Sequence, residues 1–196
     1  MDFELAHQYF QEMKVIANED GGTLWGRSLE GPMLFVDHKS RMIAANQAVE
    51  WAGVKWTMVV WPLSKDQHRR ARLMVHESFH RIQDDLGLSR KNTSNRHLDT
   101  AEGRIWLQLE SRALKKALRE SDDARRQAVR DALIFRRYRQ SLFEEAETDE
   151  TELEIHEGLA EYTGVKLSGL SETERIDFAA TKLTESEGKD PLTICA

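Results

Sequence analysis

The sequence has one cysteine, no long hydrophobic run and no excess of positive charge, and each shortage excludes a class of protein. A lone Cys195 cannot form an intrachain disulfide or a cysteine-based zinc site. No apolar stretch approaches the roughly 20 residues that cross a bilayer, so no membrane span is expected. The N-terminal residues lack the basic and apolar segments of a signal peptide. We therefore expect a cytoplasmic protein, and note that removal of a leader would leave the same sequence.

The balance of charge is acidic, with 28 lysines and arginines against 34 aspartates and glutamates and a net charge of −6. Such a chain is a poor ligand for a phosphate backbone, so nucleic acid is not expected as a partner. The length of 196 residues suits a single domain with its own core. We expect one domain over 1–196.

The N-terminal part combines a helix with a β-rich region. Apolar residues at three- and four-residue steps predict a helix over 2–19. Residues 23–61 are β-rich: the runs 33–36 and 42–44 predict a hairpin, and 57–61 is the clearest strand. Four tryptophans in this region are expected to fill the core between sheet and helices: Trp25, Trp51, Trp56 and Trp61.

The helix with the strongest signals covers 64–87. Ser64 and Gln67 have the spacing of an N-terminal capping box, and Gly87 provides a C-terminal stop. An apolar stripe predicts that this helix packs on a core; its members are Val75, Phe79, Ile82 and Leu86.

Two long helices are predicted at 100–120 and 122–143. They are expected to form an antiparallel pair, inserted between the 64–87 helix and a later helix over 151–164. Three arginines on the second are interpreted as a solvated helix face: Arg136, Arg137 and Arg139. A further helix is expected over 151–164, with Thr151 and Glu154 as a second capping box and Gly164 as its end. Residues 184–196 are expected to form a polar tail.

The sequence His76-Glu77-Ser78-Phe79-His80 matches the H-E-x-x-H pattern inside the 64–87 helix. Residues four apart lie on one helix face, so both imidazoles can reach one metal ion. Glu77 points about 100° round the helix from His76 and can approach a metal-bound water without being a ligand. A three-ligand zinc site with an open position needs one more protein ligand.

A second segment, Glu157-Gly158-Leu159-Ala160-Glu161-Tyr162, supplies a candidate. Together, the 76–80 motif and this segment resemble the gluzincin metallopeptidases of the peptidase-MA-like type. In that group a glutamate from a second helix, often followed by glycine, is the third zinc ligand. The resemblance therefore implies three zinc ligands: His76, His80 and Glu157.

The resemblance also implies that Glu77 is the general base and that Glu161, one turn after the ligand glutamate, orients a zinc-bound histidine. Glu157 and Glu161 share a helix face, and the small residues Gly158 and Ala160 allow close packing on the motif helix. The expected fold is α+β and zincin-like, mainly helical, with a small N-terminal mixed or antiparallel sheet and the inserted pair over 100–143.

Other residues stay open as site members. Glu102, also followed by glycine, lies nearer to the short spacing of better-known gluzincins and is the alternative third ligand. Glu110 is more simply explained as a partner of arginines on neighbouring helices. His156 is interpreted as a partly exposed structural histidine, and Tyr162 as a packed residue, although either could stabilise an oxyanion.

The expected function is hydrolysis of peptide bonds by zinc-activated water, with a peptide or protein as substrate and partner. An extended substrate could pair with an edge strand at 57–61 or 33–36. Two alternatives are kept. One is a metal-binding protein without catalysis, whose fourth ligand would be His156 or His97. The other is a helical interaction module, with the histidine motif accidental. A truncated or degenerate peptidase with intact ligands and little activity stays open beside them.

Overall fold

The computed structural model describes residues 1–18, 22–37 and 45–185. The chain divides into two compact units, and each contains segments that are distant in sequence. The first consists of Met1–Arg90 and Ile155–Leu170, and the second of Lys91–Glu154 and 171–185. The second unit is thus larger than the inserted pair expected over 100–143. Treatment of the whole chain as one zincin-like domain stays a prediction.

The sheet of the first unit has three strands, β1 (Met33–Asp37), β2 (Gln47–Trp51) and β3 (Val54–Trp61), in the order β1-β3-β2. β2 and β3 form an antiparallel hairpin, whose turn places Ala52 and Gly53 at positive φ. β1 pairs with β3 in parallel. The partner predicted for β1, 42–44, lies outside the described residues. The expected mixed sheet is confirmed, with its central strand at 54–61.

Helix α1 (Phe3–Ile16) confirms the first predicted helix and begins where the Asp2 side chain accepts a hydrogen bond from the Leu5 amide. Its buried residues are Ala6, Tyr9 and Met13. Phe3, in the first turn, is 79% exposed and lies outside the core.

Helix α3 (Gln67–Gln83) confirms the strongest helix prediction and its apolar face. The predicted cap was wrong: the Asp66 side chain, not that of Ser64, accepts from the Arg69 amide at 2.8 Å. Gly87, with φ of 71°, ends the segment as predicted after a short 3-10 turn, Asp84–Leu86. Val75, Phe79 and Ile82 are buried in the core of the first unit.

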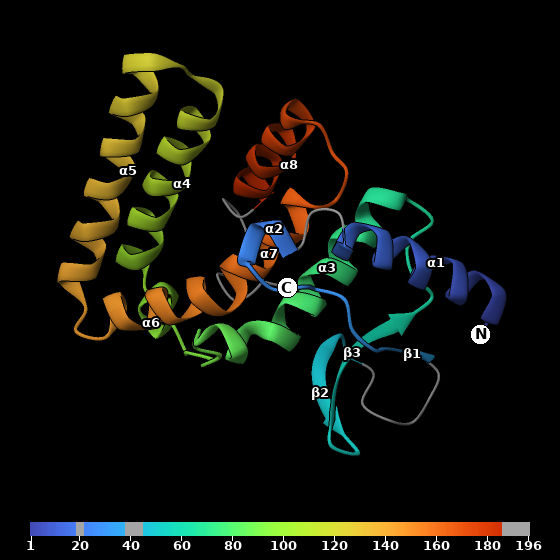
Figure 1. Ribbon diagram of the computed structural model, residues 1–196. Coiled ribbons are helices and arrows are strands. Elements are labelled where there is room, and N and C mark those ends of the chain that lie inside the picture. Colours follow the sequence, from blue (N-terminus) through green and yellow to red (C-terminus); the bar gives the residue numbers. More distant parts are fainter. Residues whose placement is uncertain (19–21, 38–44, 186–196) are drawn as a thin grey trace. The chain divides into compact units, whose positions relative to one another are not determined.

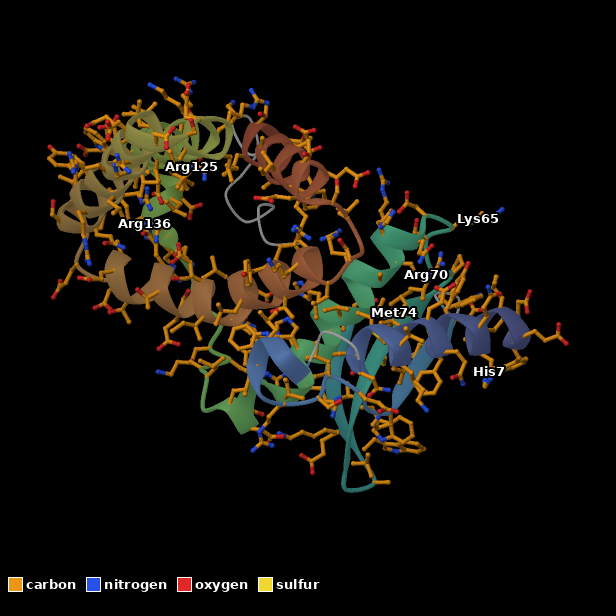
Figure 2. All side chains as sticks on the ribbon, turned by 45° about the horizontal axis from the view of Figure 1, so that its top comes forward. His7, Lys65, Arg70, Met74, Arg125 and Arg136 are labelled. Carbon is orange, nitrogen blue, oxygen red and sulfur yellow. The ribbon has the colours of Figure 1, made fainter. Side chains whose placement is uncertain are left out.

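α3 packs against β3 and β2 on one side and against α7 (Leu159–Lys166) on another (Figure 1). Figure 2 shows Arg70 and Met74 where α3 approaches α1. With neighbours on several sides, the middle of α3 is largely buried. Polar side chains there need partners inside the protein.

The tryptophans divide between core and surface. Trp61 is buried beside Tyr9, and Trp25, on the short helix α2 (Gly22–Trp25), packs on the core and donates to the Thr163 hydroxyl. Trp51 is 64% exposed at the end of β2, where its ring contacts Trp56. The prediction that all four fill the core was therefore wrong for Trp51.

The second unit is helical. Helices α4 (Ala101–Arg119) and α5 (Asp122–Leu142) confirm the predicted pair and lie side by side (Figure 1). They are accompanied by α6 (Ala146–Leu153) and α8 (Glu172–Glu185), and α8 packs on α4. The predicted tail is helical up to Glu185, and 186–196 lie outside the described residues. No described helix is both long and apolar enough to cross a membrane.

The arginines of α5 are not one solvated face. Arg139 is 2% exposed and lies between Glu110 and Glu150, with nitrogen–oxygen distances of 2.7 and 2.6 Å. Arg136 (Figure 2) also donates to Glu110. Only Arg137 agrees with the prediction. Burial of Arg139 is tolerated because carboxylates from two neighbouring helices compensate its charge.

Candidate metal centre

One face of α3 carries three polar residues at i, i+4 and i+7: His76, His80 and Gln83. This spacing aligns them along the helix, away from the stripe of Val75 and Phe79. His80 and Gln83 are buried and His76 is nearly so. The neighbours of α3 therefore have to supply polar groups that pair with this buried polar face.

Those groups come from the segment that enters α7. A regular helix was predicted over 151–164, but α6 begins at Ala146 and is followed by a π-helical turn, Glu154–Gly158, before α7. Thr151 and Glu154 are therefore not a cap. A π turn adds a residue to a helical turn, changes the direction of nearby side chains and is frequent at functional sites. Here it contains Glu157.

The side chains of His76, His80 and Glu157 converge on one point. The Nε2 atoms of the two histidines are 3.1 Å apart, and the Glu157 Oε2 atom lies 3.4 Å from the first and 3.5 Å from the second. Among the described residues, these three form the one group able to offer ligand atoms to a common metal ion.

The opposite side of the His76 ring contacts a second carboxylate. Its Nδ1 atom lies 3.4 Å from Glu161 Oε2. Arg72, one turn earlier on α3, holds that carboxylate through bonds of 2.7 and 2.8 Å to its two oxygens. Glu161 therefore occupies the place expected of an orienting group. Arg72 was missed, because nothing local in the sequence pairs it with α7.

Comparison of the chain with protein-family models, curated proteins and solved structures finds no match. The gluzincin resemblance of the two segments therefore stays a prediction.

The charges of the cluster are strongly coupled. Burial favours a neutral His76, but Glu157 and Glu161 outweigh this and raise the pKa of His76 to about 9. Burial likewise opposes ionisation of Glu157, and His76 and His80 overcome it, which holds the pKa of Glu157 well below its usual range. The metal-free cluster is an ion pair at neutral pH, and a metal would have to displace a proton from it.

Glu77 is buried beside this cluster. Burial raises the pKa of its carboxyl, and proximity to Glu157 acts in the same direction, while His76 and His80 oppose the shift. A carboxylate whose pKa is raised toward neutrality is a better proton acceptor than an exposed one.

The remaining candidates belong to the second unit. Glu102 is exposed in the first turn of α4, in the second unit, and Glu110 binds Arg136 and Arg139 as the sequence favoured. His97 binds Glu150 at 2.7 Å. None of them belongs to the group of potential ligands.

Two residues near Glu157 in sequence differ from expectation. His156 was predicted to be partly exposed, but it is buried, and its ring centroid lies 4.9 Å from that of His80. Burial lowers the pKa of His156, which favours the neutral ring. Tyr162 was expected to pack and is instead 52% exposed on α7. His156 lies in the π turn, which the sequence pattern did not reveal, and Tyr162 lies in α7.

Proposed function

We propose that the chain is a zinc-dependent metallopeptidase of the zincin-like, gluzincin type. In this proposal His76, His80 and Glu157 hold the zinc, Glu77 is the general base, and Glu161 orients His76. The substrate is a peptide or protein.

The spacing of the three ligand atoms carries the proposal. Zinc binds histidine nitrogen and carboxylate oxygen at about 2.0–2.2 Å, which puts neighbouring ligand atoms of a tetrahedron about 3.3–3.6 Å apart. The three separations in the cluster are 3.1, 3.4 and 3.5 Å. Two imidazoles and a carboxylate are also a donor set that zinc prefers. The residues therefore fit the ion.

The number of ligands favours catalysis over a purely structural metal site. Structural zinc sites are closed by four protein ligands, whereas catalytic sites keep one position for water. The ligand group has three members among the described residues, and neither His156 nor His97 is one of them. A fourth position would stay available for water and substrate.

A zinc ion bound here would lower the pKa of its water and polarise a substrate carbonyl. Glu77 would accept the proton of the attacking water and deliver it to the leaving nitrogen. Arg72 and Glu161 would keep the His76 ring in one orientation, with Nδ1 protonated and Nε2 toward the metal.

A peptide substrate could bind by adding to an outer strand of the sheet. Of the two segments anticipated for this role, 57–61 belongs to the central strand β3, which pairs with β1 over 57–61 and with β2 over 54–58. It is not an outer strand, so that prediction was wrong. The segment 33–36 belongs to the outer strand β1, and we propose this strand as the one that a peptide substrate pairs with. β2 is the other outer strand, and it packs on α3.

The deciding measurement is metal content after gel filtration for the wild type, Glu157→Ala and Glu102→Ala. We expect about one zinc per wild-type chain, loss in Glu157→Ala and retention in the matched Glu102→Ala variant. Loss of zinc in Glu102→Ala instead would make Glu102 the third ligand. A wild type that stays metal-free after reconstitution would overturn the proposal. A peptide-library screen of the loaded protein then tests hydrolysis.

A further inference from the structure

Gln83 is the last residue of α3 and one of its most deeply buried, with no exposed surface. It lies one turn after His80 on the same helix face. Its side-chain amide contacts three groups: His80 Nδ1 at 3.0 Å, the Ser89 carbonyl at 2.6 Å and the Ile155 carbonyl at 3.0 Å. No role was predicted for it from the sequence.

The orientation of this amide follows from its partners. The Ser89 and Ile155 carbonyl oxygens can only accept hydrogen bonds, so the atom that faces them has to be the NH2 group of Gln83. The Oε1 atom then faces His80, and it can only accept. The Nδ1 atom of His80 must therefore carry the hydrogen. This chain of donors and acceptors excludes the flipped amide.

We infer that Gln83 is a positioning residue that selects the Nδ1–H form of His80. The lone pair of the His80 Nε2 atom is then directed to where His76 Nε2 and Glu157 Oε2 converge. The use of that lone pair for metal rests on the proposed function. The protonation of Nδ1 does not, since it follows from the contacts of the metal-free chain.

The two histidines are thus held by different chemistry. His76 is backed by a carboxylate whose charge Arg72 balances, whereas His80 is backed by an uncharged amide. A carboxylate can exchange a proton with its imidazole, but an amide cannot. Gln83 therefore fixes the His80 ring without adding a negative charge beside Glu157 and Glu77.

Gln83 also joins the two segments that carry the proposed ligands. Its NH2 group binds the carbonyl of Ile155, which lies inside the π turn two residues before Glu157. One side chain on the histidine helix thus fixes both the second histidine and the backbone of the third ligand. The Oε1 atom of Gln83 accepts from His80, and its NH2 group donates to the backbone carbonyls. Substitutions that remove one of these groups can therefore distinguish the two contacts.

The test compares metal-free wild type, Gln83→Glu and Gln83→Met by long-range ¹H–¹⁵N NMR of the imidazoles, with circular dichroism to verify folding. Glu keeps an acceptor for His80 and loses the donors, and Met loses both. We expect a hydrogen-bonded Nδ1 proton on His80 in the wild type and in Gln83→Glu, and its loss in Gln83→Met. If Gln83 only held the backbone at Ser89 and Ile155, both substitutions would change the His80 signal to the same extent.

Zinc affinity, measured by competition with a chelating dye, is the second readout. Loss of a partner that orients a ligand typically weakens binding about 10–100-fold, which we expect for Gln83→Met, with a smaller loss for Gln83→Glu. A wild-type His80 with its hydrogen on Nε2, or an unchanged Nδ1 signal in Gln83→Met, would overturn the inference. Wild-type protein that binds no zinc would overturn the proposed function instead, and the NMR result alone would then decide on Gln83.

Discussion

Gly164 on α7 lies so close to α3 that a β-carbon added to it would be 2.7 Å from the carbonyl oxygen of Arg72. That oxygen belongs to helix backbone and cannot rotate away. The side chain of the same Arg72 binds Glu161 from α7. Gly164 was predicted as a helix end, but it lies inside α7. Its lack of a side chain allows α7, which carries Glu161, to approach α3, which carries the two histidines.

Gly164→Ala should therefore weaken zinc binding, by about tenfold or more, because α7 has to move away from α3. Alanine favours helix over glycine by about 1 kcal/mol, so a loss of stability could not come from helix propensity. We expect a net destabilisation of about 1–3 kcal/mol from overpacking. Urea unfolding and zinc titration of both proteins measure the two effects. Unchanged zinc affinity would show that the carboxylates do not depend on this contact.

Glu77→Gln should keep the zinc and lose hydrolysis. The substitution preserves the size of the side chain and removes its ability to accept a proton, a contribution of about 10²–10⁴-fold for a general base. Metal content and turnover of a cleavable peptide, measured on the same sample, separate the two properties. A variant with full activity would contradict the assignment of Glu77.

The stability of the metal-free protein should fall as pH rises through the alkaline range. The pKa of His76 is about 9 in the folded chain and 6.5 for an unperturbed histidine, so the folded state holds the proton more tightly. The resulting stabilisation is fully present below about pH 6.5 and is lost as pH approaches and passes about 9. Urea unfolding in chelator from pH 6 to 10 measures it. His76→Gln should flatten this part of the curve.

Zinc binding should have the opposite pH dependence. A histidine must be neutral to ligate, so zinc has to displace the proton that His76 holds below pH about 9. Release of one proton makes the apparent affinity rise about tenfold per pH unit between pH 7 and 9. Calorimetry in buffers of different ionisation enthalpy counts the protons released. Binding that is independent of pH over this range would exclude His76 as a ligand.

The ionic cluster of the second unit gives a prediction independent of the metal. Arg139→Met removes the buried arginine that Glu110 and Glu150 share, while Glu110 keeps Arg136, and removal of one member of a buried pair costs about 3–5 kcal/mol. The matched variant Arg137→Met, two residues earlier and exposed, should change stability by less than about 0.5 kcal/mol. Equal effects in chemical denaturation would show that burial does not distinguish the two arginines.

The sequence by itself determined the features that local interactions control. The apolar stripe of Val75, Phe79 and Ile82, together with the stop at Gly87, defined α3 and therefore placed His76 and His80 on one face. The helical pair α4 and α5 was equally clear. The pairing of the 76–80 motif with Glu157 was also proposed from sequence, but through a resemblance and not through any local signal.

The tertiary structure decided what depends on residues far apart in the chain. Parallel pairing of β1 with β3, the π turn around Glu157 and the burial of Arg139 all arise from contacts that no periodicity encodes. Gln83 shows the limit clearly: its position on the histidine face is local, but its role depends on carbonyls from Ser89 and Ile155. Helical spacing fixes which side chains share a face, whereas only the packed chain fixes what that face meets.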